Sequence, residues 1–402
     1  MANDNIEIIK DDIFRGLNSI KNQLREIVIE LYKNPEIGGE EFESIKLLKK
    51  ILQDKGFHIN EEPIENLPTA FLGESFYEKS KPNIAFLIEY DALPELGHAC
   101  GHNASAATSI GAAIALSECI KKWHLKSTVI AIGTPGEENI GSKSIMIKKG
   151  MFKNIDLAMM VHSGDYWLLD PKVYALNALE VRFKGRSAHA ANSPEHGINA
   201  LDAVVLTFNG INCLRQQIKD GTRIHGVITK GGDAPNIIPE YCSAKIYVRA
   251  ESLTYLNNMT KKVKDCAYGA SIATGCKLEI TSFEEHTDNL KSNKVMLSLF
   301  KRNLKQFISE DKIKDYENKI WASSDIGNVS HCMPTIQPVS AIVPYGIKIH
   351  TREFAKETMS DNALDNIIFS AYAMACTALD CIIDKNLLES IKKEFLEEET
   401  VK

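Results

Sequence analysis

The fold of this chain follows from one stretch, Ile84-Ala-Phe-Leu-Ile-Glu-Tyr-Asp-Ala-Leu-Pro-Glu-Leu-Gly-His-Ala-Cys-Gly-His-Asn103. Its first five residues are apolar without alternation, which is typical of a strand buried on both faces. A polar loop follows directly, and residues 103–122 then predict a helix whose first half consists of small side chains. Such side chains let a helix lie close to a sheet or a site. Ligand sites of open α/β sheets collect at the carboxyl ends of strands, which is where this loop lies.

Two later runs have the same apolar pattern as this first strand. Thr128-Val-Ile-Ala-Ile132 and Leu157-Ala-Met-Met-Val161 are short and apolar on both alternating faces, which is typical of parallel strands covered by helices. Before them, residues 6–57 have apolar positions at helical spacing, and Asn34-Pro-Glu-Ile-Gly-Gly39 interrupts the pattern, so two helices are expected there. We therefore predict an α/β fold with a mixed, mostly parallel sheet and flanking helices.

The pattern of apolar and polar residues changes at about residue 177. Leu179–Lys184 alternates like a half-exposed strand, and a helix, two strands, a second helix and a last strand follow up to Thr281. This βαββαβ order predicts a compact two-layer α+β domain. We place it at residues 177–290, inserted into a first domain formed by residues 1–176 and 291–402.

Composition restricts the possible function classes. The 402 residues exceed one ordinary domain, and the net charge of −6 gives no sign of a nucleic-acid partner. The longest apolar stretch, Ile367–Ile383, is interrupted by polar residues and predicts a buried core helix, not a membrane span. The polar, acidic start lacks the layout of a secretion signal, and the nine cysteines are scattered and odd in number. We expect a cytoplasmic protein without membrane or nucleic-acid partners.

Metal-type residues stand in the loop after the first strand. Cys100 and His102 are two residues apart with Gly101 between them, and in an extended loop side chains at this spacing point the same way. A thiolate and an imidazole on one side are good ligands for zinc. The pattern alone also fits a turn that contains a buried thiol.

Carboxylates and histidines follow the later strands. Glu137 and Glu138 come just after the second buried strand, where one can ligate a metal while the other takes a proton from metal-bound water. His162 comes after the third strand, and His350 lies late in the chain. A lone histidine at a strand end is usually structural, but here three successive strands each end in metal-type residues.

Several motifs together resemble one known family. They are Asn34-Pro-Glu-Ile-Gly-Gly-Glu-Glu-Phe42, Tyr90 to Asn103, Gly133 to Asn139, Gly185-Arg-Ser-Ala-His-Ala190, Pro235-Asn-Ile-Ile-Pro239 and Ser323-Ser-Asp-Ile-Gly-Asn-Val-Ser-His331. The chain resembles the aminoacylase and carboxypeptidase family of dinuclear metallopeptidases, in the amidohydrolase branch that carries Cys-Gly-His. The resemblance is closest to the aminoacylase-like dipeptidase and aminobenzoyl-glutamate hydrolase group.

The resemblance implies roles for individual residues. Glu137 matches the general base, and His189 matches a histidine of the inserted domain that reaches the partner subunit's site and polarises the scissile carbonyl. Asn236 and Arg249 match substrate contacts, although other arginines nearby could replace Arg249. The metal ligands of the family are matched by Cys100, His102, Glu138, His162 and His350.

Two acids are expected to support this site. Asp91 would orient a ligand histidine, and Asp325 would play a similar part, with the capping of a loop as the alternative for both. The chain departs from many members of the branch at Asn103, where aspartate is usual, and in Ser163-Gly-Asp165, which replaces a proline-containing turn.

The implied activity is hydrolysis of an amide bond in a small peptide-like substrate by a metallo-amidohydrolase or metallopeptidase. Dipeptides, N-acyl amino acids and aminobenzoyl-glutamate are the candidate substrates. Two divalent metal ions are expected, with zinc preferred and manganese, cobalt or nickel also suitable. The inserted domain is expected to act as a lid and to form a homodimer. The alternatives are a hydrolase with Cys100 as nucleophile and a non-catalytic relative that binds a peptide-like ligand.

Overall fold

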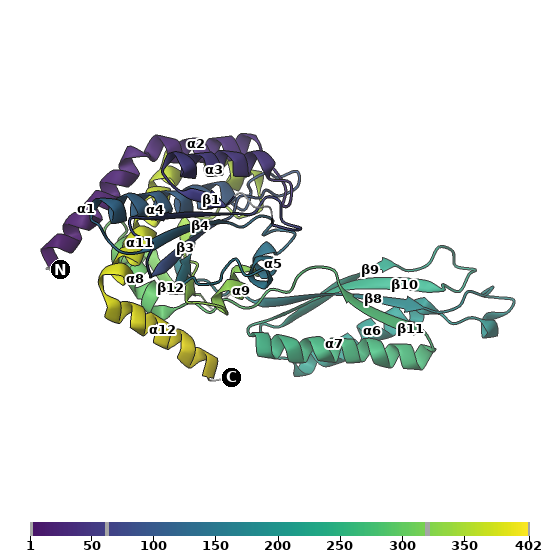
Figure 1. Ribbon diagram of the computed structural model, residues 1–402. Helices are drawn as coiled ribbons and strands as arrows, with labels where there is room; N and C mark the ends of the chain where they lie inside the picture. The colour runs from purple at the N-terminus through teal and green to yellow at the C-terminus, as the bar shows by residue number, and fades with distance from the viewer. Residues whose placement is uncertain (1–2, 61–63, 318–321, 401–402) are drawn as a thin grey trace. The chain divides into compact units, whose positions relative to one another are not determined.

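The computed structural model describes residues 3–60, 64–317 and 322–400 and divides the chain into two compact units. The first unit comprises Met1–Lys172, Lys291–Lys319 and Asn328–Lys402, and the second comprises Val173–Leu290 and Ile320–Gly327. Figure 1 follows the chain through both units. The domain bounds at residues 177 and 290 stay predictions from the sequence.

A six-stranded sheet forms the centre of the first unit. Its neighbours β3, β4, β5 and β13 run parallel, whereas β1 and β2 are antiparallel to their partners. The predicted mixed, mostly parallel sheet is therefore confirmed. In spatial order the strands are β1 (His58–Asn60), β2 (Phe71–Phe76), β4 (Thr128–Gly133), β3 (Asn83–Ile88), β5 (Leu157–Met159) and β13 (Thr335–Ile336).

Helices cover this sheet, and the number of helices in residues 6–57 differs from the prediction. Residues 6–57 contain three helices, not two, because the chain leaves helical geometry at Ile20 as well as after Lys33. Leu17, Ile20 and Leu24 all enter one core, so the apolar spacing continues across the break and conceals it. The helices with residues in this unit are α1 (Asn3–Ser19), α2 (Lys21–Lys33), α3 (Phe42–Asp54), α4 (His102–Lys122), α5 (Ser142–Lys148), α8 (Lys294–Leu304), α9 (Ile326–Ser330), α10 (Arg352–Glu357), α11 (Asp361–Ile383) and α12 (Lys385–Thr400).

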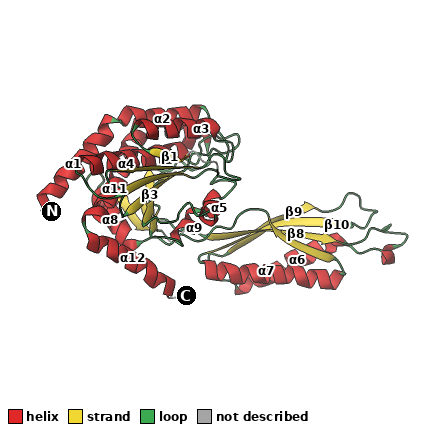
Figure 2. Cartoon of the chain, in the orientation of Figure 1, coloured by secondary structure: helices red, strands yellow, loops and turns green. Residues whose placement is uncertain are grey.

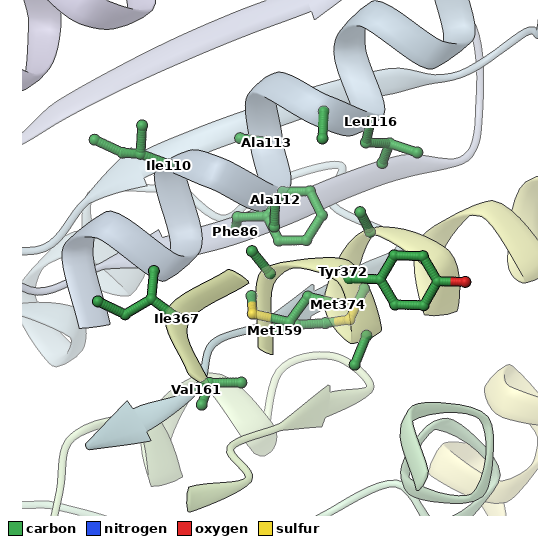
Figure 3. Close-up of a cluster of buried hydrophobic side chains, with 14 of the residues drawn as sticks. Phe86, Ile110, Ala112, Ala113, Leu116, Met159, Val161, Ile367, Tyr372 and Met374 are labelled. Carbon is green, nitrogen blue, oxygen red and sulfur yellow. The ribbon is translucent and has the colours of Figure 1, made fainter. Parts of the chain in front are cut away.

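The core of the first unit lies where α4 and α11 pack together beside the sheet. Figure 3 shows Ile110, Ala113 and Leu116 of α4 close to Phe86 of β3 and Tyr372 of α11. Almost all of α4 is buried, which is possible because its side chains are mainly small. The small-residue helix predicted from the sequence therefore lies between the sheet and a second helix.

Helix α11 is long and apolar enough to cross a membrane by composition alone. However, 83% of its apolar window is buried inside the protein. It contacts α4, α8 and α1, so it is the core helix that the sequence predicts over Ile367–Ile383. The polar residues Ser370 and Thr377 are buried there and hydrogen-bond to protein oxygens.

A smaller sheet in the first unit carries one of the candidate ligands. His162 is the first residue of β6 (His162–Gly164), which pairs in parallel with β14 (Val339–Ala341). The remaining strands are β7 (Trp167–Asp170) and β12 (Ile313–Tyr316), in the order β12-β7-β14-β6.

The second unit has the predicted βαββαβ order. Its antiparallel sheet has the spatial order β11-β8-β10-β9, and Figure 2 shows α6 and α7 together on one side of it. The helices pack on the sheet through a separate apolar core that includes Val181, Val204 and Val263. The elements are β8 (Ala175–Lys184), α6 (Ala200–Leu214), β9 (Arg223–Lys230), β10 (Tyr241–Ala250), α7 (Leu253–Thr274) and β11 (Lys277–Ser282), with short 3-10 turns at Pro194–His196 and Arg215–Gln217.

Close packing at α4 leads to a first prediction. A Cβ added at Gly111 would lie 3.1 Å from Leu24 and 3.4 Å from both Ala371 and Leu17. Gly111→Val should therefore lower the free energy of unfolding by ~1–3 kcal/mol, measured by denaturant titration. Gly16→Val is the matched control, because Gly16 lies in α1 with only Glu118 within 4 Å of the added atom. Equal stability of the two variants would contradict this packing.

Candidate metal centre

The candidate ligands gather at one edge of the parallel strands in the first unit. The Cys100–His102 loop follows β3, Glu137 and Glu138 follow β4, and His162 follows β5. Because these three strands are parallel neighbours, their carboxyl ends meet.

The ligand atoms of these residues lie close together. Three groups each have their donor atoms within 4.8 Å of one another: Cys100, His102 and His162; Cys100, Glu138 and His350; and His102, Glu137 and Glu138. The structure thus brings together the five predicted metal ligands and the predicted general base.

Gly101 determines how Cys100 and His102 reach the same site. The sequence predicted an extended loop here, and that prediction is wrong. Gly101 has a φ of +81°, and His102 is the first residue of α4. A Cβ on Gly101 would lie 2.5 Å from the Cβ of Ser163. The left-handed turn and this close approach both require glycine, and the turn replaces strand-like alternation as the cause of the convergence.

The two buried histidines present the same ring nitrogen to the site. His102 Nδ1 lies 2.9 Å from Asp91 Oδ1, and His162 Nδ1 lies 2.8 Å from the carbonyl oxygen of Ser163. Both partners are acceptors, so Nδ1 of each ring donates its proton, and in the neutral ring Nε2 carries the lone pair. This is the arrangement in which an imidazole binds a metal.

Distances between donor atoms fit a bound cation. Cys100 Sγ lies 3.6 Å from His162 Nε2, and His350 Nε2 lies 3.6 Å from Glu138 Oε1. A tetrahedral ion at ~2.3 Å from sulfur and ~2.0 Å from nitrogen keeps those two atoms about 3.5 Å apart. His102 Nε2 and Glu138 Oε1 are buried without a hydrogen-bond partner among the described residues. The donor set therefore fits a thiolate-binding and imidazole-binding divalent metal.

Burial controls the protonation of these groups. It raises the pKa of the Cys100 thiol well above its usual value and lowers the pKa of His162 to about 4. Burial also opposes ionisation of Glu138, but His350 and His102 hold the pKa of that carboxyl below its usual value. A buried thiol with a raised pKa is a poor nucleophile by itself, whereas a bound divalent cation would ionise it. This disfavours the cysteine-nucleophile alternative.

Asp91 contacts two of the candidate ligands. Its Oδ1 accepts from His102, as above, and its Oδ2 accepts from the backbone N–H of Glu138 at 3.0 Å. One buried carboxylate therefore positions both the histidine after β3 and the glutamate after β4. This placement is in accord with the expected orienting role.

The run Ser163-Gly-Asp165 connects the other ligand loops. The Ser163 hydroxyl donates to the Gly101 carbonyl at 2.8 Å. Asp165 accepts from the Gly346 backbone and from Lys348 Nζ, both at 2.9 Å, and so holds the turn that precedes His350. The His350 backbone N–H in turn donates to the Ala99 carbonyl at 2.7 Å. Ser163 and Asp165, which stand where a proline-containing turn is usual, thus hydrogen-bond to the segments that carry the other ligands.

The motif Asn34–Phe42 supports the loop that carries the glutamate pair. Glu41 is buried, and its Oε1 accepts from the Gly136 backbone at 2.8 Å. Its Oε2 accepts from the Gly39 backbone at 2.8 Å and from the Thr69 hydroxyl at 2.7 Å. A Cβ on Gly38 would lie 2.5 Å from the Gly136 Cα, so the two loops are in close contact. The sequence reasoning matched this motif but assigned no role to Glu41.

Asn103 has a packing role. Its side-chain amide donates to the Val28 carbonyl at 3.2 Å and to the Thr358 hydroxyl at 2.9 Å, and both contacts join α4 to other parts of the first unit. An ionised aspartate at this position could not make these donations.

The predicted residues of the inserted domain do not lie together. His189 and Asn236 are exposed on adjacent segments, where the Ala190 backbone donates to the Asn236 carbonyl at 3.0 Å. These segments continue from the end of the sheet at which Tyr241 pairs with Lys184, whereas Arg249 pairs with Leu176. Arg249 follows Tyr241 by eight positions along β10, which is about 27 Å along a strand.

Arg249 and Asp325 both belong to the second unit. Arg249 donates to the Ser323 hydroxyl at 2.6 Å, and its guanidinium lies 5.5 Å from the centre of the Tyr247 ring. Asp325 is buried. The predicted part of Asp325 in supporting the ligands stays a prediction.

Comparison with known proteins agrees with this geometry. The family model described as the peptidase dimerisation domain of the M20 family matches residues 175–271. The Xaa-Arg dipeptidase of Mus musculus is 39% identical over 345 residues, covering 83% of this chain and 79% of the relative. The chain belongs to the M20 peptidase family. One of the subunits of the p-aminobenzoyl-glutamate hydrolase of Escherichia coli is 26% identical, covering 94% of this chain and 93% of that protein.

A solved M20 structure has the same fold. It is a dinuclear metal binding peptidase from Bacillus subtilis, which matches with a TM-score of 0.66 at 16% identity and covers 90% of this chain and 99% of that one. This likeness shows a shared fold. As a member of the M20 peptidase family, the chain is a hydrolase of peptide or amide bonds, as the sequence predicts.

The two contacts of Asp91 lead to a second prediction. Asp91→Asn replaces one acceptor oxygen by an NH2 group, which can only donate, so the side chain can accept from only one of His102 and the Glu138 backbone. Affinity for divalent metal should fall ~10–100-fold, measured by competition with a chromophoric chelator. Asp54→Asn, at an exposed position in α3, is the control and should bind metal as the wild type does. Wild-type affinity in Asp91→Asn would show that Asp91 does not orient the ligands.

Proposed function

We propose that this enzyme is a dipeptidase-like amidohydrolase that releases an amino acid with a free carboxylate from a small amide. The observation that carries the proposal is the likeness to the Xaa-Arg dipeptidase over most of both chains. Dipeptides with a basic second residue are therefore the first candidate substrates. Aminobenzoyl-glutamate and N-acyl amino acids come next, because the p-aminobenzoyl-glutamate hydrolase chain also matches over most of its length.

Cys100, His102, Glu138, His162 and His350 are the proposed ligands of the two metal ions. Support comes from the three overlapping groups whose donor atoms lie within 4.8 Å of one another, and from the buried atoms that lack a hydrogen-bond partner among the described residues. A thiolate with imidazoles favours zinc, while manganese, cobalt and nickel also accept this mixture of ligands.

The chemistry follows from how the side chains are arranged. Two bound divalent ions would lower the pKa of water and polarise the substrate carbonyl. Glu137 would take a proton from the attacking water and deliver it to the leaving nitrogen, so amide and water become a carboxylate and an amine. His189 would donate a hydrogen bond to the carbonyl oxygen, and Arg249 would bind the substrate carboxylate with Asn236 beside it.

A homodimer explains the separation of the candidate substrate contacts. About 27 Å along β10 lies between Arg249 and the sheet end near His189, which is more than a dipeptide spans. One copy cannot bring both residues to one substrate, so His189 would act on the site of the partner copy. The match to a peptidase dimerisation domain over residues 175–271 supports this arrangement.

The cellular location is part of the proposal. All nine cysteines are unpaired, and several of them are buried in the core. Free thiols in this number suit a reducing compartment, so we place the enzyme in the cytoplasm.

Amine release from a substrate panel tests the proposed function. The protein is stripped of metal and then given zinc, manganese, cobalt or nickel, with Xaa-Arg and Xaa-Lys dipeptides, aminobenzoyl-glutamate and N-acyl amino acids as substrates. Cleavage should require metal and should be fastest for a dipeptide with a basic second residue. Cleavage that survives metal removal would contradict the mechanism, and faster cleavage of aminobenzoyl-glutamate would overturn the substrate assignment.

Mixing two inactive variants tests the roles of Glu137 and His189. Glu137→Gln and His189→Ala should each lose at least ~100-fold in kcat while keeping their metal, because each removes a group that acts in the transition state. An equal mixture, unfolded and refolded together, should recover roughly a quarter of wild-type activity, since half of the dimers are mixed and each has one intact site. An inactive mixture would contradict the exchange of His189 between copies.

A further inference from the structure

An ion pair lies buried beside the metal centre and has no part in the mechanism above. Glu89 directly follows β3, and Lys143 is the second residue of α5. Lys143 Nζ lies 2.7 Å from Glu89 Oε1, and both side chains are fully buried. Taking two charges out of water costs more than such a contact usually returns, so a buried pair of this kind is seldom explained by stability alone.

The second oxygen of Glu89 faces a candidate metal ligand. Glu89 Oε2 is buried without a hydrogen-bond partner among the described residues and lies 3.5 Å from His102 Nε2. His102 Nε2 likewise has no hydrogen-bond partner in the described part of the chain, while Nδ1 of the same ring is engaged by Asp91. Two lone pairs therefore face each other in a region without exposure, which is stable only when a proton or a cation lies between them.

The separation of these two atoms matches that of neighbouring ligands on one ion. An imidazole nitrogen and a carboxylate oxygen, each ~2.0–2.2 Å from a tetrahedral ion, are about 3.4 Å apart. The observed 3.5 Å is close to this value and to the 3.6 Å between Cys100 Sγ and His162 Nε2. Glu89 also offers an oxygen within 4.8 Å of a Glu137 oxygen, so it faces the interior of the site.

We propose that Glu89 is a further carboxylate donor to the ion that His102 holds, and that Lys143 is its positioning residue. Lys143 holds Oε1, which turns Oε2 toward the ion and keeps the carboxylate from rotating away. The centre would then have a further anionic donor in addition to the Cys100 thiolate and Glu138. This inference rests on the proposed metal site and adds one ligand to it.

The test uses a pair of variants that avoids leaving a lone buried charge. Glu89→Gln alone removes the carboxylate that pairs with the buried Lys143 and can fail to fold, so the double variant Glu89→Gln/Lys143→Met removes both charges together. The matched control is Lys10→Met/Asp380→Asn, which removes another buried lysine–carboxylate pair, joined at 2.9 Å between α1 and α11. The readouts are zinc stoichiometry, zinc affinity by chelator competition, and the visible absorption spectrum of the cobalt-loaded protein.

The expected result is specific to one of the two ions. The Lys10/Asp380 control should bind two zinc ions with the same affinities as the wild type. Its cobalt spectrum should also match that of the wild type. The Glu89/Lys143 variant should bind one ion at least tenfold more weakly and change the cobalt bands. Lys143→Met alone should weaken the same ion by a smaller factor, because Glu89 is retained.

Two outcomes distinguish a failure of this inference from a failure of the proposed function. If the wild type binds two ions and the Glu89/Lys143 variant binds both with unchanged affinity and an unchanged cobalt spectrum, Glu89 is not a donor and only this inference fails. If the wild type binds no divalent metal, the proposed function fails before the role of Glu89 arises.

Discussion

The mutual repulsion of buried donor groups is the constraint on which this site depends. Cys100, His102, His162 and Glu138 direct sulfur, nitrogen and oxygen atoms into one small, buried volume, and two of these atoms, on His102 and Glu138, have no hydrogen-bond partner among the described residues. Without a cation such an arrangement costs free energy, because each donor has lost its water. With divalent ions in place the same atoms become ligands. The surrounding contacts, from Asp91 to Ser163, hold the donors in this position.

The parallel sheet makes this convergence possible. Strands β3, β4 and β5 are neighbours, so the loops after their carboxyl ends meet although up to 62 residues separate them along the chain. Helix α4 starts at His102 and is buried along most of its length, which fixes the loop before it. Glu41 and Asp165 then connect the second and fourth ligand segments to their neighbours. The ligand loops are therefore held by the buried helix α4 and by hydrogen bonds between neighbouring loops.

The strands, the element order of the second unit and the candidate metal donors could be predicted from the sequence, because each of these depends on local pattern or on residue type. It mistook the backbone at Gly101, since spacing alone does not distinguish an extended loop from a left-handed turn that opens a helix. It missed the break at Ile20, whose side chain continues the apolar pattern. It gave Glu89, Lys143 and Glu41 no role, because a charge beside a buried strand reveals its partner only once the chain is folded. The separation of Arg249 from the sheet end near His189 follows from strand register, which the sequence does not specify.

Anomalous X-ray diffraction from crystals of the zinc-loaded protein, recorded on both sides of the zinc absorption edge, tests the central claim most directly. The account predicts two anomalous peaks in the first unit, which share Cys100, His102, Glu138, His162 and His350 as their nearest protein donors. A single peak at other residues, or no peak beside Cys100 and His102 in protein shown to contain zinc, would contradict the assignment of this cluster as the dinuclear centre.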